Sequence, residues 1–180
     1  MPRTETTTRE LFKFAELSET AKQTALENCY DWNVGDSYWY ESTIEDAERA
    51  GLKLSEFDID RGNVRIHYLA GWTGEDVARQ IVEDHGETCD TYKAAKEYLA
   101  DRDALVSKYS APLEPDRVAE GNEDDYDNEL DELEKDFLKT MGEEYLSILR
   151  KEYDYQTSEE AIRESIECNE VEFLEDGTRA

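Results

Sequence analysis

The sequence predicts an α+β fold in which a small antiparallel sheet packs with five to six helices, one of them long and acidic. Three observations support this. Residues 54–70 form a β-hairpin pattern, because a turn-forming stretch around Gly62 separates two runs of alternating apolar side chains. Residues 123–153 place apolar side chains three or four positions apart, which is typical of an amphipathic helix. Residues 170–174 alternate again, and we expect this C-terminal strand to join the sheet of the hairpin.

The elements before the hairpin are short. Residues 11–17 alternate in the manner of a strand, and the hydroxyl of Ser18 can then satisfy an amide in the first turn of a helix. This helix is predicted over 19–30. A second helix follows over about 37–50 and ends at Gly51, a residue that suits a helix C-terminus.

Two more helices follow the hairpin. Thr73 and Asp76 have the spacing of a capping box, in which two side chains satisfy amide groups at a helix start. The helix that they begin is predicted to end near His85, before Gly86. The next helix is predicted over about 89–109.

Proline and glycine mark the boundary before the long helix. Residues 110–121 contain two prolines and a glycine and are predicted to form an internal loop. Near the C-terminus, Thr157 and Glu160 repeat the spacing of a capping box and predict a last helix. We treat residues 1–180 as one domain, in which 122–180 combine the acidic helical segment with the C-terminal strand.

The charge of the chain argues against several classes of function. The 180 residues include 20 Lys and Arg against 47 Asp and Glu, which gives a net charge of −27. Binding to nucleic acid or to anionic lipid depends on cationic side chains, so we expect neither direct nucleic-acid binding nor membrane binding. No apolar run approaches the roughly 18 residues of a membrane span. The three cysteines lie far apart, which favours a reducing cytoplasm.

The acidic excess is concentrated in the predicted long helix. Between Glu123 and Glu144, eleven of the twenty-two residues are acidic, which corresponds to about one carboxylate per 3 Å of helix axis. One DNA strand presents a phosphate about every 3.4 Å. The charge density is therefore that of a surface that imitates nucleic acid. Four residues spaced three, four and three apart form what we term the acidic stripe: Asp124, Asp127, Asp131 and Glu134.

Two other interpretations of the charge stay open. An acidic helix face is most often a solvated face, which Lys135 and Lys139 would partly neutralise here. Adaptation to high salt would also favour acidic side chains, and the chain contains only nine lysines.

The sequence contains no motif typical of catalysis or of cofactor binding. It has no Gly-rich phosphate loop, no nucleophile elbow and no H-E-x-x-H pattern. We therefore predict a protein that is not an enzyme and that binds neither cofactor nor metal. A hydrolytic pair of carboxylates remains an alternative, since any fold brings some of 47 acidic residues together.

Two groups of residues are candidates for binding sites. His85 and Cys89 are four apart, but Gly86 between them and the lack of further ligands favour a helix end over a metal site. The aromatic residues around Trp39 are assigned to the core by their helical spacing. Trp39 itself is the secondary binding candidate, because Tyr40 rather than Trp39 shares the phase of Ile44.

Several phrases of the sequence resemble a widespread group of small acidic proteins from phages and prophages. Residues 14–25 are similar to the phrase F-x-E-L-S-x-x-A-K-x-x-A with which these proteins open. Further similar phrases lie at 38–40, 58–63, 85–89 and 173–177. The resemblance implies a mobile-element product in a bacterial cytoplasm, a context that favours antagonists of host defence such as restriction or CRISPR systems. It implies no catalytic residues.

Together, these observations predict a non-enzymatic acidic protein that binds a host nucleic-acid-binding protein in place of nucleic acid. The acidic stripe would make the contact. The alternative is a phage accessory or structural protein whose acidity serves solubility only, with its contacts made by Trp39 or another apolar patch.

Overall fold

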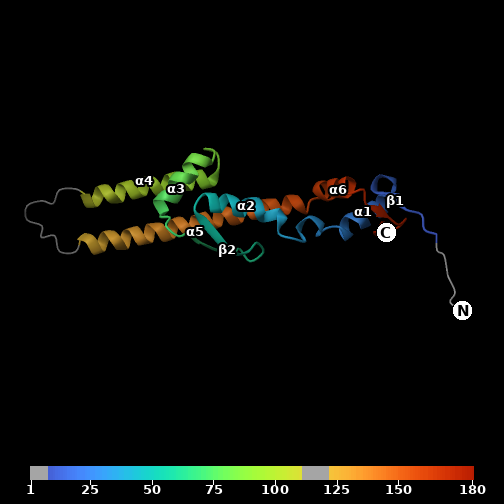
Figure 1. Cartoon of the computed structure of the whole chain (residues 1–180), viewed down its shortest axis with the longest axis horizontal. Coiled ribbons are helices and arrows are strands. Elements are labelled where there is room, and N and C mark those ends of the chain that lie inside the picture. Colours follow the sequence, from blue (N-terminus) through green and yellow to red (C-terminus); the bar gives the residue numbers. More distant parts are fainter. Residues whose placement is uncertain (1–7, 111–121) are drawn as a thin grey trace, which may run out of the picture. The chain divides into compact units, whose positions relative to one another are not determined.

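The computed structural model describes residues 8–110 and 122–180 (Figure 1). Within these ranges the fold is α+β, as predicted, with helices α1 to α6 and two antiparallel sheets of two strands each. The predicted loop at 110–121 lies outside the described residues, except for its first residue, which ends a helix. The chain divides into two compact units, Met1–Tyr40 with Lys151–Ala180 (the first unit) and Glu41–Arg150 (the second unit).

The first unit consists mainly of short elements. They are β1 (Phe12–Lys13), the 3₁₀ helices η1 (Phe14–Glu16) and η2 (Trp32–Val34), α1 (Glu19–Asn28), α6 (Glu159–Cys168) and β4 (Glu172–Phe173). Ser18 caps α1 as predicted, because its Oγ accepts a hydrogen bond from the amide of Ala21 at 3.2 Å. The cap of α6 is one residue later than predicted. Ser158 accepts from the amide of Ala161, whereas the hydroxyl of Thr157 donates back to Tyr153 in the preceding turn.

The prediction that the C-terminal strand joins the hairpin is wrong. β4 pairs with β1 instead, with Phe12 opposite Phe173. The N-terminal strand is also shorter than the predicted 11–17, because η1 turns Phe14 and Leu17 into the same core, where each is 5% exposed. The rings of Phe14 and Phe173 meet edge to face with their centroids 6.4 Å apart. Burial of these rings, rather than an alternating pattern, holds the two short strands together.

The second unit contains the hairpin and the longer helices. They are α2 (Tyr38–Arg49), β2 (Leu52–Asp58), β3 (Asn63–Tyr68), α3 (Gly74–Asp84), α4 (Asp90–Ser110) and α5 (Asn122–Gln156); α2 begins and α5 ends in the first unit. The predicted hairpin is confirmed, since Asp58 pairs with Asn63 across the turn and Gly62 has a φ of +72°.

Helix α5 packs against both the hairpin and α4. In Figure 1, α4 and the first half of α5 run side by side, and the ring of Tyr98 on α4 stacks on Phe137 of α5 with centroids 4.2 Å apart. At Gly142 the helix approaches the hairpin so closely that a Cβ there would lie 3.0 Å from Val64 Cγ1 and 3.2 Å from Ile66 Cγ2. The absence of a side chain at Gly142 therefore sets the distance between α5 and the sheet.

We expect Gly142→Leu to lower the free energy of unfolding by about 2 kcal/mol, because the added side chain must force the hairpin away from α5. Chemical denaturation followed by circular dichroism measures this loss. Lys139→Leu, at an exposed position of the same helix, is the control and should change stability by less than about 0.5 kcal/mol. Equal effects of the two substitutions would contradict the close approach.

Candidate protein-binding surface

The acidic stripe lies on the first half of α5, whose second half contributes to the core of the second unit. The predicted apolar row continues along this helix, and its members from Phe137 onward are at most 4% exposed. They are Phe137, Met141, Tyr145 and Leu149. Because one side of the helix is buried in this way, polar side chains can occupy only the other side.

Three of the four stripe residues lie on the open side of α5. Asp124, Asp127 and Asp131 are exposed, whereas Glu134 is half-buried at the edge of that side. The main-chain oxygen of Glu134 accepts a hydrogen bond of 3.4 Å from the hydroxyl of Tyr68, so this turn of the helix contacts the hairpin. Lys135 Nζ lies 3.9 Å from Asp131 Oδ2 and partly neutralises the stripe.

Between Asp124 and Glu143, four further acidic residues are exposed on α5 that the stripe did not include. With three stripe residues they form what we call the acidic face: Asp124, Asp125, Asp127, Asp131, Glu132, Asp136 and Glu143. A spacing of three, four and three follows only one row of side chains along a helix. The solvent-exposed part of a helix that packs on one side is wider than one row. The high local density of acidic residues was the signal in the sequence that could have identified Asp125, Glu132, Asp136 and Glu143.

Glu129 does not belong to the acidic face, although the sequence count included it. Lys108 Nζ lies 2.6 and 2.7 Å from the two carboxylate oxygens of Glu129. The hydroxyl of Tyr109 donates to the same carboxylate at 2.9 Å. The hydrogen bond from Lys108, aided by the one from Tyr109, holds the pKa of the Glu129 carboxyl below its usual value. Glu129 therefore joins α5 to α4 and is already paired.

The secondary candidate, Trp39, is half-buried at the start of α2. Its ring meets Tyr40 and Tyr153 edge to face, with centroid distances of 5.2 and 5.5 Å. Its neighbour Tyr38 is 75% exposed. An aromatic group of the first unit is thus partly open to solvent beside Trp39.

His85 and Cys89 lie in the segment between α3 and α4. His85 follows the last residue of α3 and its amide donates to the carbonyl of Ile81 at 2.9 Å, which confirms the predicted helix end, while Cys89 is exposed. Among residues 8–110 and 122–180, no group of three or more His, Cys, Asp or Glu side chains is placed to hold a metal ion. In the same ranges, no helix has both the length and the apolar character needed to cross a membrane.

A partly buried polar network that the sequence did not reveal links four helical segments of the second unit. Asp46 on α2 accepts a hydrogen bond of 3.1 Å from the hydroxyl of Tyr145 on α5. The same oxygen, Oδ2, lies 3.4 Å from His85 Nε2 at the end of α3. His85 Nδ1 in turn lies 2.7 Å from Thr91 Oγ1 on α4. We call these four residues the Asp46 network.

The electrostatics of the Asp46 network favour an ionised carboxylate. The hydrogen bond with His85, aided by Arg49 and Tyr145 and opposed by burial, lowers the pKa of Asp46 to about 2. Burial raises the pKa of Tyr145 far above its usual range, so its hydroxyl stays a donor. Thr91 is 3% exposed. Thr91, His85 and Asp46 thus form a hydroxyl–imidazole–carboxylate chain of hydrogen-bonding groups. Because the Thr91 hydroxyl is buried, the network serves to join helices.

No known family model, characterised protein or solved structure matches this chain. The functional conclusion therefore rests on the geometry of the chain itself.

We expect Asp46→Asn to lower the free energy of unfolding near pH 7 by about 1 to 2 kcal/mol, because the ionised carboxylate holds the network together. Since the folded-state pKa of Asp46 is depressed from 3.8 to about 2, its contribution is present above pH 4 and is lost as the pH falls toward 2. The difference between the variant and the natural protein should therefore shrink over this interval.

Urea unfolding between pH 2 and pH 7 measures this difference. Glu45→Gln, at an exposed neighbouring position, is the control, because it changes the net charge equally. A difference for Asp46→Asn that is constant with pH, or no larger than that of the control, would contradict the assigned role.

Proposed function

We propose that this chain is a non-enzymatic, phage-type protein of the bacterial cytoplasm that binds a host nucleic-acid-binding protein in place of nucleic acid. The acidic face of α5 makes the contact. The observation that carries the proposal is the set of exposed carboxylates that α5 presents between Asp124 and Glu143. The resemblance of several sequence phrases to small acidic phage proteins supplies the biological context.

The spacing of the acidic face supports imitation of a phosphate backbone. From Asp124 to Glu143 the helix extends about 30 Å, with roughly one exposed carboxylate per 4 Å of its axis. The phosphates of one DNA strand follow each other at about 3.4 Å. Lys135 and Lys139 lower the net charge of the face, and each lies 3.9 Å from one of its carboxylates. The remaining charge is held on a helix that is fixed by its packed side, so little ordering is needed on binding.

The chemistry of the partner follows from this charge. A groove that binds nucleic acid is lined by lysine and arginine, and its attraction for an acidic surface grows as the salt concentration falls. The net charge of −27 adds a long-range attraction of the same sign. A protein of this kind competes with nucleic acid without any chemical step.

The aromatic group around Trp39 supports a second candidate surface. Tyr38, the neighbour of Trp39 in the first unit, is 75% exposed. Large aromatic side chains are common at the centres of protein interfaces. An accessory or structural phage protein would bind its partner there, and the acidic face would only keep it in solution.

We expect reversal of the acidic stripe, with lysine at Asp124, Asp127, Asp131 and Glu134, to abolish capture of a partner from bacterial lysate. The fold should remain when lysine replaces the three exposed residues Asp124, Asp127 and Asp131 alone, and this triple variant, which keeps the half-buried Glu134 beside Tyr68 and Tyr98, should also lose capture. Circular dichroism and thermal unfolding check the fold. The control carries lysine at four exposed acidic residues of other helices: Glu45, Glu97, Asp101 and Glu164. Equal capture by the control and the stripe variants would contradict the proposal.

We also expect the captured partner to elute as the salt concentration rises, because exposed charges attract each other less at higher ionic strength. Raising sodium chloride from 0.05 M to 0.5 M in steps tests this. A partner that stays bound at the highest step, and that is lost with Trp39→Ala, would instead favour the aromatic surface of the first unit.

A further inference from the structure

A depression of about 360 Å³ lies beside Trp72, in the second unit. It is lined by Gly71, Trp72, Asp76, Arg79, Gln80 and Glu83. The last four belong to one side of α3, at positions that repeat with the helical turn. The depression is therefore bounded by an indole ring and by a polar helix side.

The ring of Trp72 is fixed in place by the turn that follows the hairpin. The amide of Trp72 donates to the carbonyl of Leu69 at 3.0 Å, and the amide of Leu69 donates to the carbonyl of Gly51 at 2.8 Å. Gly51 has a φ of +84°, and a Cβ at this position would overlap the Trp72 ring. One side of the indole thus lies directly on the Gly51 backbone, while Trp72 as a whole remains half-exposed.

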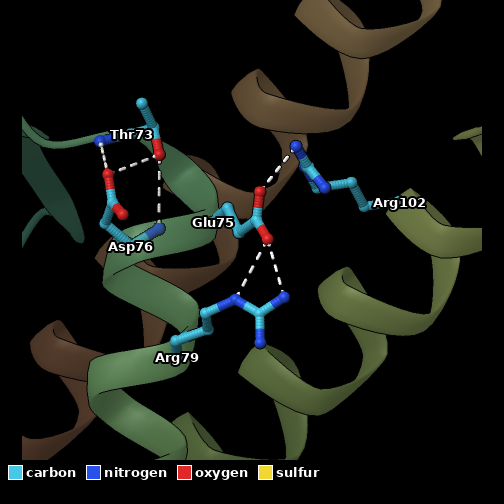
Figure 2. Close-up of polar contacts among 5 residues, drawn as sticks. All are labelled: Thr73, Glu75, Asp76, Arg79 and Arg102. Atoms are coloured by element: carbon cyan, nitrogen blue, oxygen red, sulfur yellow. Dashed lines mark hydrogen bonds and ion pairs between the residues drawn. The ribbon is translucent and has the colours of Figure 1, made fainter.

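The cation within the depression is already neutralised. Figure 2 shows Arg79 turned toward Glu75, with Nε and Nη2 at 3.0 and 2.7 Å from one carboxylate oxygen. Arg102 from α4 approaches the other oxygen of Glu75 at 2.6 Å. This bridge links α3 to α4, and it leaves Arg79 satisfied by its own helix.

The other polar groups of the lining offer acceptor oxygens. Asp76 Oδ2 accepts hydrogen bonds from the amide and the hydroxyl of Thr73, which leaves Asp76 Oδ1 available as an acceptor (Figure 2). The side-chain nitrogen of Gln80 donates a hydrogen bond of 2.8 Å to Asp84, which leaves the side-chain oxygen of Gln80 available as an acceptor. Glu83 is exposed and forms no ion pair within the described part of the chain. An occupant must therefore supply donors and positive charge.

We propose that the depression beside Trp72 binds a cationic side chain of a protein partner, above all the guanidinium group of an arginine. A planar guanidinium lies over the indole by cation–π attraction and donates hydrogen bonds to Glu83 and Gln80. The chain already contains such a pair, since Arg179 lies 5.2 Å from the centre of the Trp32 ring in the first unit. The proposal rests on the proposed function for its partner, because proteins that bind nucleic acid expose many arginines.

The test is a titration of the ¹⁵N-labelled full chain with N-acetyl-arginine amide, followed by two-dimensional nuclear magnetic resonance. We expect saturable shifts of the Trp72 indole signal and of the amides of Gly71, Gln80 and Glu83. The Trp32 indole, which already lies beside an arginine, should move less. The citrulline analogue has nearly the same shape without the charge, and it should bind at least tenfold more weakly.

Two variants locate the interaction. Glu83→Gln removes the charge of an exposed side chain, keeps its size and should weaken arginine binding about threefold. Trp72→Phe keeps a ring over Gly51 and should weaken it by a similar factor, because indole attracts cations best. Glu87→Gln, at an exposed position outside the lining, is the control. Equal binding of citrulline, equal shifts at all three tryptophans, or no effect of Glu83→Gln would overturn the proposal.

The outcomes separate this site from the proposed function. A failed titration removes the Trp72 site and leaves salt-sensitive capture by the acidic face as it was found. Failed capture from lysate removes the proposed function, while a specific arginine shift would still establish the Trp72 site.

Discussion

The buried side of α5 is the constraint on which the second unit depends. Phe137 stacks on α4, Gly142 lets the hairpin approach, and Tyr145 reaches the carboxylate of Asp46. Each contact fixes the position and rotation of the same helix, and the acidic residues that these contacts do not use stay exposed. A net charge of −27 opposes any compact fold by self-repulsion, and burial along this helix offsets part of that cost. One element therefore contributes both to the core and to the acidic face.

The few cations of the chain decide which acids remain open. Lys108 pairs with Glu129, and Arg79 and Arg102 share Glu75. Exposed ion pairs of this kind add little to stability, commonly less than about 1 kcal/mol each. Their larger effect is on the charge pattern, because they neutralise the acids that face other helices. Within residues 8–110 and 122–180, the ion pairs on the acidic face of α5 are those of Lys135 with Asp131 and of Lys139 with Glu143.

Patterns among residues close together in the sequence predicted most of the helices and strands. They did not predict contacts between residues that are far apart in the sequence. The hairpin turn, the Ser18 cap and the long helix each depend on residues a few positions apart, so the sequence displays them directly. The pairing of β4 with β1 does not, because two-residue strands hold too little pattern to select a partner. The Asp46 network joins residues up to 99 positions apart, and none of its members stands out in its own segment. Within the candidate site, acid density located the helix, whereas the pairing of Glu129 and the width of the open side required the packed structure.

The most direct test of the central claim is whether the partner can bind nucleic acid and this protein at the same time. The captured partner, a labelled DNA duplex that it binds and an excess of this protein would be examined together by analytical ultracentrifugation. Imitation of nucleic acid predicts that the DNA is released and sediments free, with no ternary complex, and that the stripe-reversed variant leaves DNA bound. A stable complex of all three components would contradict the account, because the acidic face could not then occupy the DNA groove.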